Sequence, residues 1–226
     1  MKTLKKIWWR LLFASYALVY LPWFFFLESK ITMDYPNLHI INGPLDDMIP
    51  FCEVFIIPYF LWFAYIVASC VIMVPKADNQ EFIRFALSLI IGMSLCMVIC
   101  MVYPNGLTLR PDTLPDNAFG RLVAGLYATD TPTNVFPSIH VYNSIAVHTA
   151  LSKCKALKNH KGLLTGSLIL CILICMSTVF LKQHSLYDVG GAFVLMGVIY
   201  YVLYILPERR AQKQAENEKH YASADE

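Results

Sequence analysis

The chain has 226 residues, of which 57% are hydrophobic and 15% are charged, and its formal net charge at neutral pH is +2. This composition is too apolar for a soluble domain, which has to cover its core with polar surface. We therefore expect an integral membrane protein whose main partner is the lipid bilayer. The composition excludes a soluble enzyme, and no nucleic-acid partner is expected.

Six stretches are long and apolar enough to cross a bilayer, since a spanning helix needs roughly 20 mostly apolar residues. In chain order they are residues 7–27, 50–74, 82–103, 135–152, 163–181 and 185–206. The first is longer than the apolar core of a signal peptide and lacks a small-x-small cleavage site, so we interpret it as a retained helix. The predicted fold class is all-α, a polytopic membrane bundle of six transmembrane helices.

The chain divides into two predicted regions of different character. Residues 1–207 form one six-helix membrane domain with short loops. Residues 208–226 are charged and lack apolar periodicity, so we expect a mobile polar cytoplasmic tail.

Basic residues predict the orientation, because Lys and Arg collect in cytoplasmic loops. They occur in the N-terminal segment, after the second and fourth spans, and at the start of the tail: Lys2, Lys5, Lys6, Arg10, Lys76, Arg84, Lys153, Lys155, Lys158, Lys161, Arg209 and Arg210. Six spans place all of these on one side. We therefore expect a cell-membrane protein with both termini in the cytoplasm and with residues 28–49, 103–134 and 182–185 outside.

His184 and Asp188 open the sixth predicted span and lie four residues apart, which places both side chains on one face of a helix. A carboxylate in this position fixes the tautomer of the imidazole and stabilises its charged form. A histidine held in this way can attack phosphorus to give a phosphohistidine. The alternative is an interfacial hydrogen bond that only orders the start of the helix. For the pair alone this alternative is favoured. Ionisable groups at membrane depth are costly and usually mark function, and with His140 and Arg110 on the same side we favour a catalytic site.

His140 and Ser138 belong to the run Phe-Pro-Ser-Ile-His at the start of the fourth predicted span. Helix N-termini attract anions through unpaired backbone amides and the helix dipole. A phosphoryl group bound there would meet the hydroxyl and amide of Ser138, while His140 could protonate the leaving alkoxide as a general acid. The alternative for His140 is a capping histidine or one that faces the bundle.

Two cations near the same boundary are candidates for binding phosphate. Arg110, followed by Pro111 in the loop after the third span, offers a planar charge suited to clamping phosphate. Its alternative is an ordinary exposed loop arginine. Lys182, two residues before His184, is either a second phosphate contact or an interfacial lysine.

No metal and no other cofactor is expected. A catalytic zinc site takes three closely placed protein ligands, and the outer side shows no such pattern. Cys96 and Cys100, like Cys171 and Cys175, are four residues apart inside predicted spans, and we interpret them as packing residues. His148, inside the fourth span, is interpreted as a hydrogen-bonded histidine of the bundle.

The three clusters resemble, in order and spacing, the motifs of the type 2 phosphatidic acid phosphatase superfamily, Lys-x6-Arg-Pro, Pro-Ser-Gly-His and Ser-Arg-x5-His-x3-Asp. The matching positions are Arg110, Pro111, Pro137, Ser138, His140, Ser177, His184 and Asp188. The resemblance covers residues 103–188 and implies a six-helix core. It implies that His184 is the nucleophile and Asp188 its orienting partner. It also implies that His140 assists the leaving group and that Arg110 clamps phosphate, without a metal.

Three positions depart from these motifs. Tyr103 stands where the family has Lys, Ile139 where it has Gly, and Thr178 where it has Arg. Two cations of the family are therefore missing, and Lys182 is the nearest candidate substitute. The runs Phe-Pro-Ser-Ile-His and Lys-Gln-His are also similar to the branch that includes inositol phosphorylceramide synthases, which transfer a head group.

Three functions remain open at this point. The first is a lipid-phosphate phosphatase that hydrolyses a phosphomonoester or diphosphate lipid, and we favour it because hydrolysis needs no second substrate pocket. The second is a head-group phosphotransferase that uses the same histidine with an alcohol acceptor. The third is a non-catalytic protein that binds or transports lipid phosphates. The sequence leaves the lipid and the oligomeric state open.

Overall fold

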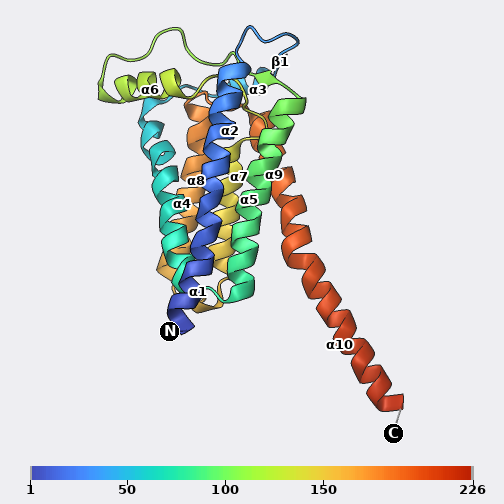
Figure 1. Cartoon of the computed structure of the whole chain (residues 1–226). Coiled ribbons are helices and arrows are strands. Elements are labelled where there is room, and N and C mark those ends of the chain that lie inside the picture. The colour runs from blue at the N-terminus through green and yellow to red at the C-terminus, as the bar shows by residue number, and fades with distance from the viewer. Residues whose placement is uncertain (1, 225–226) are drawn as a thin grey trace.

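The computed structural model describes the backbone of residues 2–224 and the side chains of residues 7–217. Long helices pack side by side in a bundle, with the N-terminus at one end and most of the loops at the other (Figure 1). The bundle consists of α1 (Lys2–Leu11), η1 (Leu12–Tyr16), α2 (Ala17–Lys30), η2 (Glu53–Phe55), α4 (Ile56–Lys76), α5 (Asn79–Val102), α7 (Ile139–Lys153), α8 (Lys161–Phe180) and α9 (Leu186–Tyr200). The predicted all-α bundle is confirmed.

Five helical segments of the described chain are long and apolar enough to cross a membrane. They are Ile7–Lys30, Glu53–Lys76, Asn79–Val102, Lys161–Phe180 and Leu186–Asn217. The remaining predicted span corresponds to α7, which has 15 residues. At 1.5 Å per residue α7 is about 22 Å long, shorter than a bilayer core of ~30 Å. A count of six spans therefore stays a prediction.

The centre of the bundle is α7, which contacts α4, α5, α8 and α9. Most of its side chains are buried, among them Val141, Tyr142 and Val147. α5 approaches α7 closely because Gly92 has no side chain, and a Cβ atom there would lie 1.9 Å from the ring of Tyr142. The hydroxyl of Tyr142 donates to the carbonyl oxygen of Ser88, also on α5, at 2.6 Å. Small residues commonly permit such close helix packing in membranes.

The loop-rich end of the bundle contains short elements that the sequence analysis did not predict. They are β1 (His39–Ile40), α3 (Pro44–Asp47), β2 (Asn105–Gly106) and α6 (Ala118–Thr129), and β1 pairs with β2 in parallel. α6 lies across this end of the bundle (Figure 1). The side chain of Asn117 caps it by accepting from Gly120 N at 2.8 Å. Its apolar face packs with Tyr59 and Leu181, so α6 covers the ends of α4 and α8.

The basic segments around η3 (Lys155–Leu157) and between α4 and α5 lie at the opposite end of the bundle from α6 (Figure 1). After α9 the chain continues through η4 (Tyr201–Ile205) into α10 (Leu206–Ala224). α10 extends away from the bundle (Figure 1). The tail predicted over residues 208–226 is therefore helical as far as residue 224, and its mobility stays a prediction.

Candidate active site

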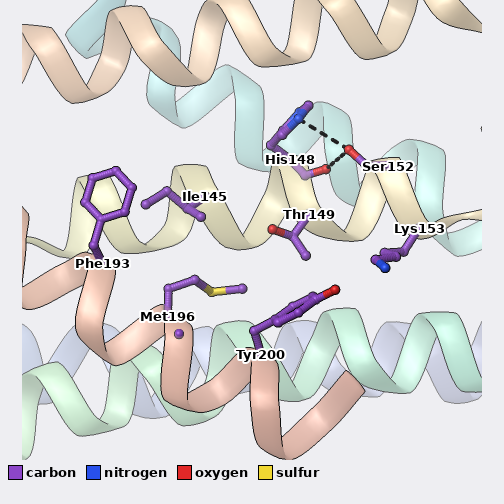
Figure 2. A pocket seen from close by; sticks show the side chains of 9 residues that line it. Ile145, His148, Thr149, Ser152, Lys153, Phe193, Met196 and Tyr200 are labelled. Carbon is purple, nitrogen blue, oxygen red and sulfur yellow. Dashed lines mark hydrogen bonds between the residues drawn. The ribbon is translucent and has the colours of Figure 1, made fainter. Parts of the chain in front are cut away.

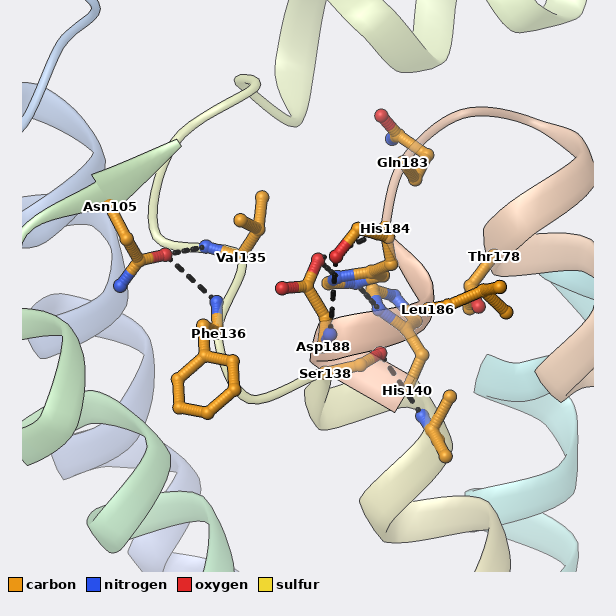
Figure 3. A network of polar contacts seen from close by, with 12 residues as sticks. Asn105, Val135, Phe136, Ser138, His140, Thr178, Gln183, His184, Leu186 and Asp188 are labelled. Carbon is orange, nitrogen blue, oxygen red and sulfur yellow. Dashed lines mark hydrogen bonds and ion pairs between the residues drawn. The ribbon is translucent and has the colours of Figure 1, made fainter. Parts of the chain in front are cut away.

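Two segments that are far apart in sequence meet at the loop-rich end of the bundle. One is the turn that leads into α7, and the other is the link between α8 and α9 (Figure 3). The backbone N–H of Ser138, in the first segment, donates to the carbonyl oxygen of Asp188, in the first turn of α9 directly after the second segment, at 3.1 Å. This bond holds the starts of α7 and α9 together and brings His140 and His184 into one site.

Asp188 is fully buried and binds His184 through its Oδ2 atom. The Nδ1 atom of His184 lies 3.3 Å from Oδ2. The same oxygen accepts from the backbone N–H of Ser185 at 2.8 Å, while Asp188 N donates to Ser185 Oγ at 3.2 Å. These reciprocal bonds form a capping box at the start of α9. The helix cap therefore fixes the carboxylate that orients His184.

The other ring nitrogen of His184 faces His140. His184 Nε2 lies 3.4 Å from His140 Nδ1 (Figure 3). A carboxylate at Nδ1 of His184 places the proton there, so Nε2 keeps its lone pair. His140 Nδ1 is then the donor across this contact. The lone pair of one histidine and the N–H of the other point into the same space.

The ring of His140 is held by aromatic side chains of α4. Its centroid lies 4.6 Å from the ring of Tyr59 and 4.5 Å from the ring of Trp62. His140 is 8% exposed and His184 is 6% exposed, whereas Asp188 is 0% exposed. The two histidines are thus nearly buried but remain slightly exposed to solvent, whereas the carboxylate of Asp188 is not exposed.

Ser138 caps α7 and is completely buried. Its Oγ accepts from Val141 N at 3.4 Å, and its own amide is bound to the carbonyl oxygen of Asp188. In this state the hydroxyl and the amide of Ser138, which we expected to bind phosphate, both form hydrogen bonds within the protein. Ser138 lies next to the histidine pair, as predicted, but it positions α7.

The turn before α7 is fixed by polar groups that the sequence analysis did not single out. Asn105 is buried, and its Oδ1 accepts from the amides of Val135 and Phe136 at 2.9 Å each (Figure 3). Glu28, at the end of α2, accepts from the side chain of Asn134 at 2.8 Å. Gly191 makes room for Phe136, because a Cβ atom there would lie 2.5 Å from its ring.

Arg110 lies beside the pair without touching either histidine, as far as the described side chains show. Its guanidinium donates to the carbonyl oxygens of Tyr127 at 3.2 Å and Asp130 at 2.6 Å, and to Oε1 of Gln183. It also stacks over the ring of Tyr127 at 4.2 Å. Burial lowers the pKa of Arg110, and Asp130 opposes that shift. The group stays charged at neutral pH in any case.

A polar network that the sequence analysis missed links Arg110 to the histidines. Gln183, directly before His184, donates through Nε2 to Asp130 Oδ2 at 3.1 Å. The hydroxyl of Tyr59, whose ring packs on His140, donates to the same oxygen at 2.7 Å. Tyr59 lies in an apolar span and Asp130 in a long loop, so neither has a local sequence signal. Only the tertiary packing brings them together.

Lys182 is buried and directed away from the histidines, toward the turn that follows α3. Its Nζ atom donates to the carbonyl oxygens of Asp46 and Ile49 at 2.6 Å each. Asp46 Oδ1 in turn accepts from the amide of Leu186 at 2.7 Å. These bonds attach residues 46–49 to the link between α8 and α9. Lys182 is thus a structural contact between these two segments in the state described.

The two motif positions without a cation have other contacts. Tyr103 stacks on His39 of β1, with ring centroids 4.2 Å apart. Thr178 is buried, and its carbonyl oxygen accepts from the amides of Gln183 and His184 at 3.0 Å each. Within the part of the chain that the structure describes, no group of three or more His, Cys, Asp or Glu residues could hold a metal ion. His148 binds Ser167, in agreement with a bundle histidine.

The comparison with protein families agrees with the geometry. A family model described as the PAP2 superfamily matches residues 81–212, more than half of the chain, and this region includes every predicted site residue. No curated protein and no solved structure matches the chain at a significant level. Because this match covers more than half of its length, the chain belongs to the PAP2 superfamily.

Proposed function

We propose that the chain is a membrane lipid-phosphate phosphatase that works through a phosphohistidine at His184. Membership of the PAP2 superfamily supports a lipid phosphatase or phosphotransferase type of function in general. The observation that carries the specific proposal is the relay from Asp188 through His184 to His140, with separations of 3.3 Å and 3.4 Å. It combines an oriented nucleophile with a proton donor that faces it.

In the proposed first step, Nε2 of His184 attacks phosphorus while the bond to the ester oxygen breaks. His140, protonated on both ring nitrogens once the phosphate is bound, gives one proton to the departing alkoxide, which leaves as a lipid alcohol, and becomes neutral. Asp188 stabilises the positive charge that develops on the ring of His184. In the second step His140 accepts a proton from water, which attacks the phosphohistidine and releases phosphate. Both histidines then return to their starting states.

This mechanism requires the two rings to separate when phosphate binds. A reacting group sits ~3–3.5 Å from its nucleophile, and the acid needs a further hydrogen bond of ~2.6–3.2 Å to the leaving oxygen. The 3.4 Å contact between Nε2 of His184 and Nδ1 of His140 has no room for both. Catalytic contacts often differ between free and substrate-bound enzymes. We place the movement at His140, which is held by ring packing, whereas His184 is held by a buried carboxylate.

Arg110 is the proposed phosphate clamp. Its present acceptors are two carbonyl oxygens and Gln183, the residue directly before the nucleophile. Exchange of Gln183 for a phosphate oxygen would give a charge-assisted contact, which is roughly twice as strong as one to a neutral acceptor. Ser138 and Lys182 support the site in this proposal by holding the start of α7 and residues 46–49.

A head-group phosphotransferase is the second candidate, because two observations favour it. The positions of two family cations hold Tyr103 and Thr178, so the site has fewer charges to bind a phosphomonoester dianion. α6 also packs over the ends of α4 and α8, which limits the access of water. Excluding water protects a reactive intermediate until an alcohol reaches it.

The proposed location is the cell membrane, with the site on the outer side, since the basic loops lie at the other end of the bundle. The deciding experiment incubates purified protein with phosphatidic acid, phosphatidylglycerol phosphate, a polyprenyl diphosphate and a sphingoid phosphate, with and without alcohol acceptors. We expect phosphate release from at least one lipid, and none from His184→Ala. Product that forms only with an acceptor would establish the transferase. Binding without turnover of any lipid would establish the non-catalytic alternative.

A further inference from the structure

A groove of about 420 Å³ lies between α7 and α9, outside the candidate active site. Its walls are mainly apolar side chains, with Ile145 on α7 and Phe193, Met196 and Tyr200 on α9 (Figure 2). Phe193 is 54% exposed and Tyr200 is partly exposed, so the groove opens to the outside of the bundle. In a membrane-spanning bundle such an opening faces lipid.

The groove runs toward the end of the bundle opposite His140. Ile145 lies more than one turn along α7 from His140, and Lys153 lies in the last turn of the same helix. The residues that line the groove come from α7 and α9 and include none of the candidate site residues. The groove is therefore a separate feature that begins in the middle of the bundle and ends near the basic loops.

Lys153 lines the basic end of the groove and forms no ion pair among the described side chains, although Tyr200 and the carboxylate of Glu208 interact with its charge. Its Nζ atom lies 5.6 Å from the centre of the Tyr200 ring. Two neighbouring cations are neutralised, since Arg84 pairs with Glu208 at 3.1 Å and Lys155 pairs with Asp78 at 3.0 Å. Lys153 thus keeps a positive charge available at the place where the apolar groove ends.

Another polar wall residue, His148, already has partners inside the protein. Its ring nitrogens lie 3.0 Å from Ser167 Oγ and 3.3 Å from Ser152 Oγ. An apolar occupant would therefore leave no hydrogen bond of His148 unmade. The volume is within the range of ligand pockets, ~300–1,000 Å³.

We propose that this groove binds one anionic phospholipid from the leaflet on the side of the basic loops. One acyl chain lies along Ile145, Phe193 and Met196, and the phosphate group meets Lys153. An apolar channel that faces the bilayer and ends at a lysine outside any ion pair is complementary to the acyl chain and phosphate of such a lipid. This site is independent of the proposed catalytic function.

Native mass spectrometry of the full chain in detergent tests the proposal with dioleoyl phosphatidylglycerol and dioleoyl phosphatidylcholine as probes. We expect the wild-type protein to retain phosphatidylglycerol preferentially. Lys153→Gln should reduce that preference roughly fivefold, the scale of one lysine near an anionic head group. Lys158→Gln, an exposed lysine of the same end that does not line the groove, is the matched control and should keep the preference.

A second pair of variants tests the acyl-chain part of the site. Gly197 lines the groove and has nothing within 4 Å of an added Cβ atom, so Gly197→Leu is chosen to put a bulky apolar side chain at the groove. It should reduce retention of both lipids. Gly166 on α8 is equally open but lies outside the groove, and Gly166→Leu should retain lipid as the wild type does. Circular dichroism of each variant verifies the helical fold.

Any of three results would overturn the proposal. The first is equal retention of the two lipids by the wild-type protein, and the second is an equal effect of Lys153→Gln and Lys158→Gln. The third is a dimer that Gly197→Leu dissociates, which would assign the groove to a second copy of the chain. If Gly197→Leu fails to fold, the comparison of Lys153→Gln with Lys158→Gln tests the proposal by itself.

Discussion

The Nε2 atom of His184 lies 3.4 Å from the Nδ1 atom of His140, although 44 positions separate the two residues in the sequence. The bond between Ser138 N and the carbonyl oxygen of Asp188 brings their helices together. Nδ1 of His184 is bound to a buried carboxylate, so the nitrogen that faces His140 has a free lone pair. This arrangement underlies the proposed phosphohistidine mechanism and the predictions below.

Replacement of the proposed nucleophile should abolish turnover. His184→Ala leaves no group that can form the covalent intermediate, so phosphate release from any active lipid should fall to background. Vanadate, which mimics five-coordinate phosphorus, should inhibit the wild-type protein, while chelators should leave its rate unchanged. Rates that fall with EDTA and return with a divalent metal would point to a metal-activated water instead.

The contribution of Asp188 to catalysis should come from its charge more than from its role in the helix cap. Asp188→Asn keeps an oxygen that can accept from Ser185 N but loses the charge that stabilises the His184 ring, so kcat should fall by roughly two to four orders of magnitude. Ser185→Ala is the matched control. It removes the hydroxyl of the cap and should cost about 1 kcal/mol of stability, with a much smaller change in kcat. Equal rates in the two variants would contradict the orienting role.

The contribution of Arg110 to catalysis should depend on the planar shape of its guanidinium group as well as on its charge. Arg110→Lys keeps the charge but loses the fork of donors, and we expect a loss of about 2–4 kcal/mol in transition-state stabilisation. Arg121→Lys is the control, since Arg121, on α6, forms an exposed ion pair with Asp116, which precedes that helix. Steady-state kinetics of both variants measure the effect. A wild-type kcat/KM in Arg110→Ala would remove Arg110 from the site.

Tyr59 should position His140 through its ring. Tyr59→Phe keeps the ring contact and loses only the bond to Asp130, which retains its bond from Gln183. We expect a rate within about tenfold of wild type, since a net hydrogen bond contributes ~0.5–1.5 kcal/mol. Tyr59→Ala removes the ring and should lose far more activity. If Phe and Ala reduce kcat equally, the hydroxyl is the functional group.

The sequence predicts the parts of this protein that have a local signal. Apolar length identified the long helices. His184 and Asp188 are in contact, as their four-residue spacing predicted, but His184 lies before the N-cap Ser185, so the contact arises at the cap of α9 and not from a shared helix face. α6 was missed because its 12 residues are too short for a span and lie in a long polar loop. The Asn117 cap before an amphipathic run was the available signal.

Other features of the site depend on tertiary packing and could not be predicted locally. Lys182 is adjacent to the motif in sequence, yet a positive φ of 54° and two carbonyl acceptors direct it to residues 46–49. Tyr59 packs on His140, and Asp130 binds Tyr59 and Gln183, contacts that join α4, the end of α6 and the segment before α9. Their roles, like those of the predicted site residues, await the mutational tests above.

Topology decides on which side of the membrane the site lies. In a variant without native cysteines, a cysteine at position 112 should react with an impermeant thiol reagent in intact cells, and one at position 158 should not. Asp112 lies in the loop after α5 near the site, and Lys158 lies in the basic segment after α7. The reverse labelling pattern would place the site in the cytoplasm.

The covalent intermediate is the most direct test of the central claim. Purified protein would be mixed with a phosphorus-labelled lipid phosphate from the active panel, quenched within milliseconds, and digested under alkaline conditions that preserve phosphohistidine. We predict label on the peptide that contains His184, and no labelled peptide from His184→Ala. Label on another residue, or full turnover by His184→Ala, would contradict the account.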